Sequence, residues 1–432
     1  MSLLAAYKHF VDDEIRQAQF YMICRQTGII FSSIVIARFL SVEEVGGIEM
    51  LMLCGYLMTF FWSDALIRGF LSTTGLVKDK ESSSTFLWMY LIGGFLAMLV
   101  LFTGQKWLIP LFTSRAHLEG IRLFIFYQAL IIPVWIAPFL GLIKGQNSVL
   151  LSLFVMICPA FACWTGFNSL PDINGVMIGL VCYAFVGFIW VLTKTKFIQR
   201  LRFRSLIVMI WPATWPLVMY AVSSGLARSF DAWLVARYFD ESSFAIFRYG
   251  AREFPLVVAL TAGFSTAMIS RLLQPDGLTE LKERSTRLMH MVYPILTFFI
   301  LISPFAFEII FGFEYRKSAS IFNIYLLLAL TQLFFPQTIL TARRDSKLLW
   351  YVSIAELIVN VIASLLLMPH FGLIGIAIGT LIAFAFEKIV LLFLIHAKYK
   401  IGVSEIMDLR VWFLYVIILI SAFILSIWMF GI

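Results

Sequence analysis

The sequence of 432 residues contains little charge, because Asp, Glu, Lys and Arg together make up only 13% of it. Soluble domains carry about 25% charged residues. Hydrophobic residues make up 61% of the chain, and the mean hydropathy is +0.93. An aqueous fold cannot hide that much apolar surface. The composition therefore excludes a soluble protein and predicts a polytopic membrane protein without a soluble domain.

The sequence also lacks the motifs of metal and nucleotide sites. It contains no H-E-x-x-H sequence and no G-x-x-x-x-G-K-[ST] phosphate loop, which disfavours a zinc hydrolase and an ATP-driven pump. Its five cysteines all lie inside apolar runs, without the paired spacing of a disulfide framework or a zinc site. We therefore expect no metal and no cofactor. These cysteines are Cys24, Cys54, Cys158, Cys163 and Cys182.

Apolar segments long enough to cross about 30 Å of hydrocarbon at 1.5 Å per residue recur along the whole chain. They predict an all-α fold of about twelve or thirteen transmembrane helices. The predicted spans are 16–40, 46–70, 85–104, 120–143, 148–167, 174–193, 207–237, 244–270, 287–311, 318–341, 348–368, 373–396 and 411–431.

Basic residues gather in alternate connections between these spans. With the amino terminus inside, the cytoplasmic segments hold about twenty Lys and Arg residues and the outer loops about five. This asymmetry predicts a cytoplasmic amino terminus. It also accounts for the net charge of +8 without a nucleic-acid partner.

Short sequences recur about 200 residues apart, which indicates an internal repeat. Ile36–Phe39 returns as Val235–Tyr238, with an offset of 237 − 38 = 199, and Gly175–Gly179 returns as Gly375–Gly379, with an offset of 200. Each repeat holds six spans, an even number, so the two halves should be parallel and enclose a central cavity. The predicted organisation is an N-lobe at 1–196, a C-lobe at 197–400 and an additional C-terminal transmembrane helix within 401–432.

Several arginines fall inside predicted spans. Burying an arginine near the bilayer centre costs about 2.5–3.5 kcal/mol, so each needs a partner, an aqueous cavity or an interface. Arg25 lies more than two turns from either end of its span, with no acid one turn away. Arg228, Arg248 and Arg252 lie about one to three turns below the outer surface; for Arg248 an interfacial position remains open. We predict that these four line a cationic cavity that binds an anionic substrate, since the guanidinium fork matches phosphate.

Acidic residues inside the spans have two interpretations. Asp64 and Glu387 are candidate carriers of protons or ions for coupling, although Arg68, four residues after Asp64, offers that carboxylate a local partner. Glu356 and Lys388 lie at similar depth on neighbouring spans, which predicts a structural ion pair.

The chain resembles the polysaccharide flippases of the multidrug, oligosaccharidyl-lipid and polysaccharide exporter (MOP) superfamily, above all the O-antigen flippases of lipopolysaccharide biosynthesis. The resemblance extends from the span 16–40 to the span 373–396. The sequences that carry it are Ala37–Leu40, Glu43–Gly46, Gly141–Gly145, Asp231 through Pro255, and Met368–Ala377.

This resemblance implies two six-helix lobes around a cavity and transport by alternating access. The implied substrate is a polyprenyl-diphosphate-linked oligosaccharide, moved to the outer leaflet of the bacterial inner membrane. Membrane lipids and a polysaccharide polymerase are the implied partners. A thirteenth helix departs from the usual twelve or fourteen.

Two other functions remain open. A cation-coupled multidrug exporter of the same fold would favour unpaired acids in the cavity, whereas this chain has an excess of arginine in its spans. A membrane glycosyltransferase or polymerase of the same pathway usually needs a large outer loop with acid or base residues, and every predicted outer loop here is shorter than about 20 residues. We therefore expect a transporter and not an enzyme.

Overall fold

The computed structural model describes residues 14–72, 80–113, 118–136, 138, 146–194, 219, 222, 225–227, 229–343 and 345–430. These residues are mostly helical, and no strand occurs among them. The chain divides into two compact units, one formed by Met1–Gly225 with Ala236–Ser242 and the other by Leu226–Val235 with Ser243–Ile432. The predicted boundary between the lobes, at residues 196 and 197, lies outside the described residues.

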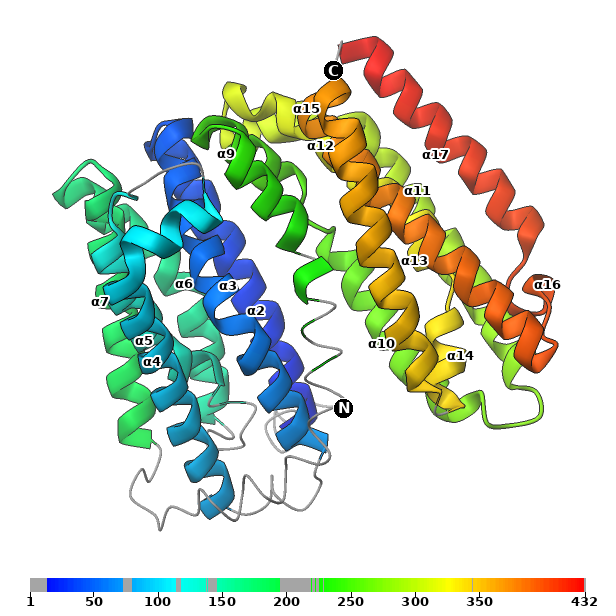
Figure 1. The fold of residues 1–432 in the computed structure, drawn as a ribbon, viewed down its shortest axis with the longest axis horizontal. Helices are drawn as coiled ribbons and strands as arrows, with labels where there is room; N and C mark the ends of the chain where they lie inside the picture. Colours follow the sequence, from blue (N-terminus) through cyan, green and yellow to red (C-terminus); the bar gives the residue numbers. More distant parts are fainter. Residues whose placement is uncertain are drawn as a thin grey trace, which may run out of the picture. The chain divides into compact units, whose positions relative to one another are not determined.

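Six of the labelled helices in the described residues belong to the first unit, and each matches one predicted span (Figure 1). Helix α2 packs against α6, α6 and α5 pack against α7, and α4 packs against α5. The contact between α2 and α6 is close: a Cβ added at Gly28 would lie 2.1 Å from the Val155 carbonyl oxygen. The helices are α2 (Glu14–Phe39), α3 (Val42–Ser72), α4 (Lys80–Phe112), α5 (Ile121–Ile136), α6 (Gln146–Ser169) and α7 (Ile173–Lys194).

The second unit contains shorter and more broken helices. It includes helical residues in 229–235 and the part of α9 from Ser243 onward. The labelled elements are α9 (Glu241–Gly250), α10 (Pro255–Arg271), α11 (Gly277–Phe311), η1 (Phe313–Lys317), α12 (Ser318–Leu327), α13 (Ala329–Gln332), α14 (Pro336–Ala342), α15 (Ser346–Tyr399), α16 (Val403–Ile406) and α17 (Leu409–Phe430).

Two spans predicted as continuous helices are interrupted. The predicted span 244–270 is divided into α9 and α10. In the predicted span 318–341, α13 ends at Gln332 and α14 begins at Pro336. Pro255 and Pro336 each occupy the start of the new helix, where a missing N–H costs nothing. The apolar pattern alone predicted the length of these spans and not their breaks.

The long helix α15 contains two predicted spans, 348–368 and 373–396. Gly372 lies between them with φ 57° and ψ −132°, a conformation that favours glycine. We therefore distinguish a first half of α15, residues 346–371, from a second half, residues 373–399.

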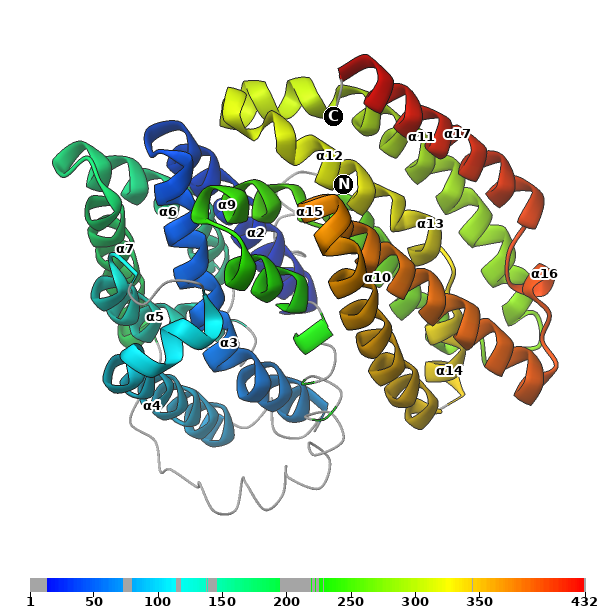
Figure 2. The same cartoon turned by 45° about the horizontal axis from the view of Figure 1, so that its top comes forward.

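Helix α17 is an integral part of the second unit. It lies beside α11 in both views (Figures 1 and 2) and also packs against α12. Asn323 on α12 joins the three helices: its amide donates to the Ile300 carbonyl oxygen and the Ser426 hydroxyl, each at 3.2 Å, and its Oδ1 accepts from Ser303 at 2.7 Å. The additional C-terminal helix predicted from the sequence is therefore present and held by buried polar contacts.

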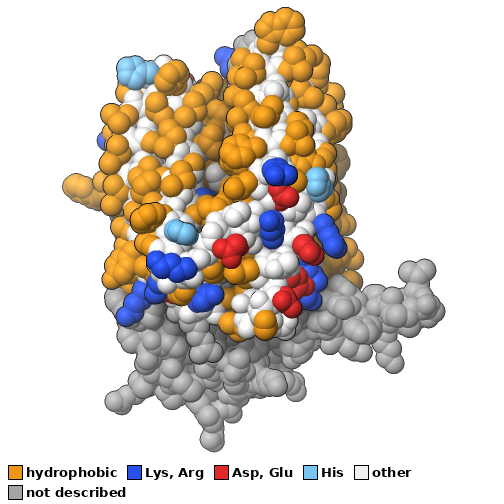
Figure 3. Space-filling model, turned by 90° about the vertical axis from the view of Figure 1, so that its right-hand side faces the viewer, with side chains coloured by type: hydrophobic (Ala, Val, Ile, Leu, Met, Phe, Trp, Pro, Cys, Tyr) orange, Lys and Arg blue, Asp and Glu red, His pale blue; other side chains and the backbone are white. Residues whose placement is uncertain are grey.

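The helices have the length and the surface of membrane spans. In the described part of the chain, seven helices are long and apolar enough to cross a membrane, or eight if the bent pair Phe313–Gln332 and Pro336–Ala342 forms one span. Large apolar side chains on α11 and α17, such as Phe298, Ile309 and Trp428, are exposed. On the face in Figure 3, hydrophobic side chains cover the upper part and charged ones gather below. The protein is thus an all-α, multi-pass membrane protein.

Candidate functional site

Arg25, on α2 of the first unit, lies close to aromatic side chains. Its guanidinium carbon lies 5.1 Å from the centre of the Trp135 ring on α5, within the range of a cation–π contact. Tyr21 on α2, Tyr127 on α5 and Tyr183 on α7 are buried and lie within electrostatic range of the same guanidinium. One aromatic ring thus contacts this cation, and three buried tyrosines from α2, α5 and α7 lie within electrostatic range of it.

The Arg25 guanidinium retains donors for a ligand. Arg25 is half-buried, it makes no ion pair within the described part of the chain, and its buried Nε has no hydrogen-bond partner there. Tyr21 does not fill this role, because its hydroxyl donates to the Val134 carbonyl oxygen at 2.9 Å. A buried guanidinium without an acid is costly unless an anion binds it. The site is therefore suited to bind an anionic group beside aromatic faces.

The other predicted arginines lie elsewhere in the chain. Arg248 is on α9, and Arg252 follows α9 with its guanidinium carbon 4.6 Å from the centre of the Tyr249 ring. Both are half-buried. Arg228 lies outside the described residues. The structure thus places Arg248 in the last turn of α9 and Arg252 four residues later, in the interruption between α9 and α10.

A buried polar cluster surrounds Asp231 in the second unit. Oδ2 of this carboxylate accepts hydrogen bonds from the Tyr325 hydroxyl on α12, at 3.0 Å, and from the Thr380 hydroxyl on the second half of α15. Asn360, on the first half of α15, is a further neighbour. Its own Oδ1 accepts from Ser364 at 2.9 Å, which leaves its amide hydrogens for other acceptors. One acid thus holds together three helical segments.

A second polar cluster contains both of the predicted charged residues of the second half of α15. Lys388 Nζ lies 2.8 Å from Glu387 Oε2, and both residues are buried. Gln337 on α14 donates to Glu387 Oε1 at 2.7 Å. Glu356, which we paired with Lys388 from the sequence, is an electrostatic neighbour of both residues, while the direct ion pair of Lys388 is with Glu387.

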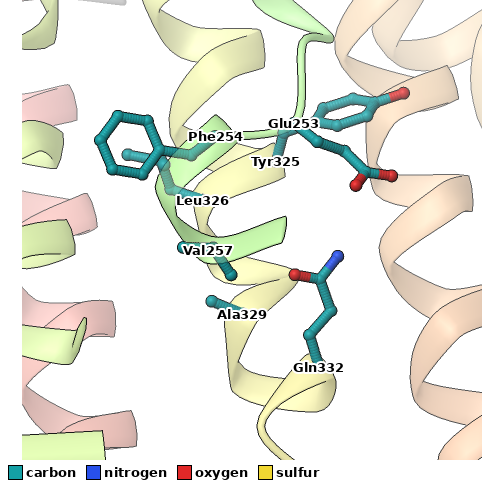
Figure 4. Close-up of a pocket in the computed structure, with 7 residues that line it drawn as sticks. All are labelled: Glu253, Phe254, Val257, Tyr325, Leu326, Ala329 and Gln332. Atoms are coloured by element: carbon teal, nitrogen blue, oxygen red, sulfur yellow. The ribbon is translucent and has the colours of Figure 1, made fainter. Parts of the chain in front are cut away.

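A small crevice lies next to the Asp231 cluster (Figure 4). Its volume is about 10 Å³, which barely admits one water molecule. Tyr325 lines it and also donates to Asp231. In Figure 4 the carboxylate of Glu253, from the segment between α9 and α10, and the amide of Gln332 on α13 point to the same side of the crevice. A polar opening therefore adjoins the buried acid.

Two other predictions concern coupling residues and metals. Asp64 belongs to helix α3, but its side chain lies outside the described residues. In the described part of the chain, no group of three or more His, Cys, Asp or Glu side chains is placed to hold a metal ion.

Sequence reasoning missed most of the uncharged members of these sites. Trp135, Tyr325, Thr380 and Gln337 belong to residue types that are frequent in any membrane bundle, and their partners are between 50 and 149 residues away in the chain. The detectable signals were the charged residues inside predicted spans: Arg25, Glu387 and Lys388, and Asp231 as an acid close to Arg228.

Comparison with known proteins gives a family and a fold. A family model described as "Polysaccharide biosynthesis protein" matches residues 35–320. The lipid II flippase MurJ, in an inward closed conformation, is similar in structure with a TM-score of 0.64 and 16% identity, over 95% of this chain and 98% of that chain. None of the curated proteins that were compared matches the sequence.

Two MATE transporters are similar as well. An outward-facing multidrug resistance MATE family transporter of the MOP superfamily has a TM-score of 0.56 and 13% identity, over 91% of this chain and 98% of that chain. A mutant of the Vibrio cholerae MATE transporter VcmN has a TM-score of 0.55 and 15% identity, over the same shares of the two chains. At this identity, the likeness shows the fold alone. The predicted MOP-type architecture is confirmed, and because the family model covers well over half of the chain, the protein belongs to the polysaccharide biosynthesis protein family.

Proposed function

We propose that the protein is a flippase for a polyprenyl-diphosphate-linked oligosaccharide, an O-antigen or similar polysaccharide repeat unit. It moves this lipid from the inner to the outer leaflet of the bacterial cytoplasmic membrane by alternating access. The family description and the fold of a lipid II flippase support transport of a lipid-linked substrate. The finer assignment of an O-antigen-like unit rests on the resemblance of the sequence.

The observation that carries the proposal is the environment of Arg25. A half-buried guanidinium with an unpaired Nε and a Trp135 ring beneath it combines the two recognition elements that such a substrate needs. Guanidinium donors bind the diphosphate, and aromatic faces accommodate sugar rings. In this proposal Arg228, Arg248 and Arg252 contribute to the same cationic path, as the sequence predicts.

The arrangement in the membrane is part of the proposal. Residues 1–196 form the N-lobe, residues 197–400 form the C-lobe, and the helix within 401–432 is additional. The amino terminus is cytoplasmic, as the distribution of Lys and Arg predicts. The protein transports without catalysing a reaction, and the polysaccharide polymerase remains a predicted partner.

A cation-coupled multidrug exporter is the alternative function. Two observations favour it: MATE transporters share the fold, and the second unit buries the acids Asp231 and Glu387. An exporter of cationic drugs would need an acid at the substrate site, whereas Arg25 lies among aromatic rings without an acidic partner in the described residues.

The test is translocation of a polyprenyl-diphosphate oligosaccharide across proteoliposomes that contain the full chain. We compare the wild type with Arg25→Ala and Arg252→Ala at matched reconstitution, and use Arg287→Ala as the control because Arg287 is an exposed arginine of α11. We expect transport by the wild type and the control, and a loss in the two site variants. Transport that persists in both would contradict the site assignment. Efflux of a cationic dye without lipid transport would instead establish the exporter.

A further inference from the structure

An apolar groove with a volume of about 430 Å³ lies between α6 and α7, at the surface of the first unit. Phe161 on α6 and Ile178 and Val186 on α7 line it, and all three side chains are exposed. At one end of the groove, the ring of Tyr183 stacks on Phe154 with 5.1 Å between the ring centres. The groove is therefore open along its length to the surroundings of the unit.

Direct contact between the backbones of α6 and α7 forms the base of the groove. A Cβ added at Gly179 would lie 2.0 Å from the Ala162 carbonyl oxygen, and one added at Gly166 would lie 2.2 Å from the Gly175 carbonyl oxygen. Small residues allow membrane helices to approach this closely. The bulky side chains on either side of the contact then form two walls, so the groove is a product of how the two helices pack.

The polar side chains of the groove are satisfied within their own helix. The Thr165 hydroxyl donates to the Phe161 carbonyl oxygen at 3.0 Å, and the Ser169 hydroxyl donates to the Thr165 carbonyl oxygen at 2.9 Å. None of the described residues that line the groove is charged. The groove is therefore poorly suited to a sugar or a phosphate and well suited to a hydrocarbon chain.

The dimensions of the groove favour one extended chain over a helix. The lining residues extend from Phe154 on α6 to Leu170 just after it, about 24 Å at 1.5 Å per residue. Over this length the volume of about 430 Å³ gives a mean cross-section of roughly 18 Å². A helix with its side chains is about 10–12 Å wide, so its body does not fit. A single hydrocarbon chain is the occupant that matches this shape.

The groove is continuous with the surface that faces the membrane lipid. Ile157 on α6 and Phe185 on α7 lie outside the groove and are also exposed. In a multi-pass membrane protein, such an apolar surface is covered by the acyl chains of phospholipids. These chains reach the groove without any opening between helices, which favours a phospholipid as the source of the chain.

We propose that the groove between α6 and α7 is a specific site for one acyl chain of a membrane phospholipid. A chain in the groove contacts both walls and the base, and so makes more van der Waals contacts than a chain on a convex helix surface. Because the bound lipid contacts both helices, it stabilises their packing in proportion to its occupancy. This site does not depend on the proposed flippase function.

Photochemical labelling distinguishes a specific site from general contact with lipid. The full-length protein is placed in bilayers of phosphatidylethanolamine and phosphatidylglycerol, with phosphatidylethanolamine that carries a diazirine on one acyl chain as the probe. After illumination, mass spectrometry maps the labelled peptides. We expect the label on α6 and α7 to saturate as the fraction of probe rises, and the label around the exposed Phe95 on α4 to rise in proportion to the probe. Proportional labelling in both places would overturn the proposal.

Variants that fill the groove test its role directly. Ala162→Leu and Cys182→Leu each place a larger side chain in the groove from a different helix, and Ala97→Leu is the matched control on α4, because Ala97 is half-buried and does not line the groove. We expect the affinity of the saturable site to fall at least about tenfold in both groove variants and to stay unchanged in the control. Thermal unfolding shows which variants are folded. Wild-type labelling in a folded groove variant would overturn the proposal.

Two further measurements test the other possible occupants. If a polyprenyl phosphate displaces the saturable label at a lower concentration than unlabelled phosphatidylethanolamine, the groove binds a prenyl chain and the proposal is wrong. If the saturable label is missing and the exposed thiol of Cys182 can be cross-linked between two copies, a second copy covers the groove and the proposal is also wrong. Saturable labelling in a protein that moves no lipid-linked oligosaccharide would refute the flippase function and support the lipid site.

Discussion

Replacing Arg25 by methionine should weaken anion binding while the fold becomes no less stable. Methionine preserves the unbranched apolar stem of the side chain but removes the guanidinium group and its donors. If Arg25 binds the diphosphate, the variant loses hydrogen bonds to a charged group, worth about 1.5–3 kcal/mol. Since 1.4 kcal/mol is a factor of ten, binding should weaken roughly 10- to 150-fold.

The effect on stability should have the opposite sign. Arg25 has no ion pair within the described residues, so its removal relieves a burial cost of up to about 2.5–3.5 kcal/mol. Loss of the contact with Trp135 lowers the free energy of unfolding by about 0.5–2 kcal/mol. The difference is a gain in the free energy of unfolding of up to about 3 kcal/mol. A purely structural arginine would show the reverse pattern.

The binding assay uses a short-chain prenyl diphosphate and the fluorescence of Trp135, which lies beneath the guanidinium. Trp135→Phe identifies the part of the signal that comes from this residue, and Arg287→Met controls for the loss of one positive charge. Thermal unfolding of the same preparations gives the stability. An Arg25→Met protein that binds as tightly as the wild type, or that unfolds at a clearly lower temperature, would refute the reasoning.

Three further predictions concern packing and pH. Gly28→Ala should destabilise the first unit by about 1–3 kcal/mol in chemical unfolding, because the new Cβ would meet the Val155 carbonyl oxygen at 2.1 Å, whereas Gly263→Ala, with nothing within 4 Å, should cost nothing. Asn323→Ala should weaken the attachment of α17 by about 0.6–2 kcal/mol and make it more sensitive to proteolysis, since it removes hydrogen bonds to α11 and α17; unchanged proteolysis would contradict this. In the connection between α14 and α15, the hydrogen bond from Lys398 holds the pKa of Asp345 below its ordinary value. This contribution to stability is present above the ordinary pKa of about 3.9 and disappears as the pH falls through the lowered value. Asp345→Asn should therefore lower the melting temperature at neutral pH and converge with the wild type in acid; a constant difference across the range would argue against the interaction.

Much of the fold was predictable because membrane spans are a local property of the sequence. Bilayer thickness fixes the length of each apolar segment, so the predicted spans coincide with helices α2 to α7, α11 and α17. The interruptions were not predicted. A hydropathy average does not detect the helix break at Pro255. Gly250, five residues earlier, is needed because the backbone of Ser318, 68 residues later, packs against it.

The site was less predictable because its contacts join distant residues. The position of Arg25 inside a span could be read from the sequence, but the presence of Trp135 and Tyr183 around it depends on how α2, α5 and α7 pack. The pairing of Lys388 shows a similar limit. Adjacent residues on a helix point in directions about 100° apart, so the sequence favoured Glu356 on the neighbouring span as its partner. The flexible lysine side chain reaches Glu387 instead.

The interruption between α9 and α10 has a consequence for hydration. Residues 252–254 lack helical structure within a stretch that the sequence predicts to lie in the bilayer, and backbone groups there cannot remain exposed to lipid. The half-buried Arg252 and the exposed Glu253 occupy this same stretch. Because Glu253 is exposed, we expect water rather than lipid to reach this level of the second unit. A cysteine placed at Glu253 should react with a membrane-impermeant thiol reagent, whereas one placed at Phe298 on the apolar face of α11 should not.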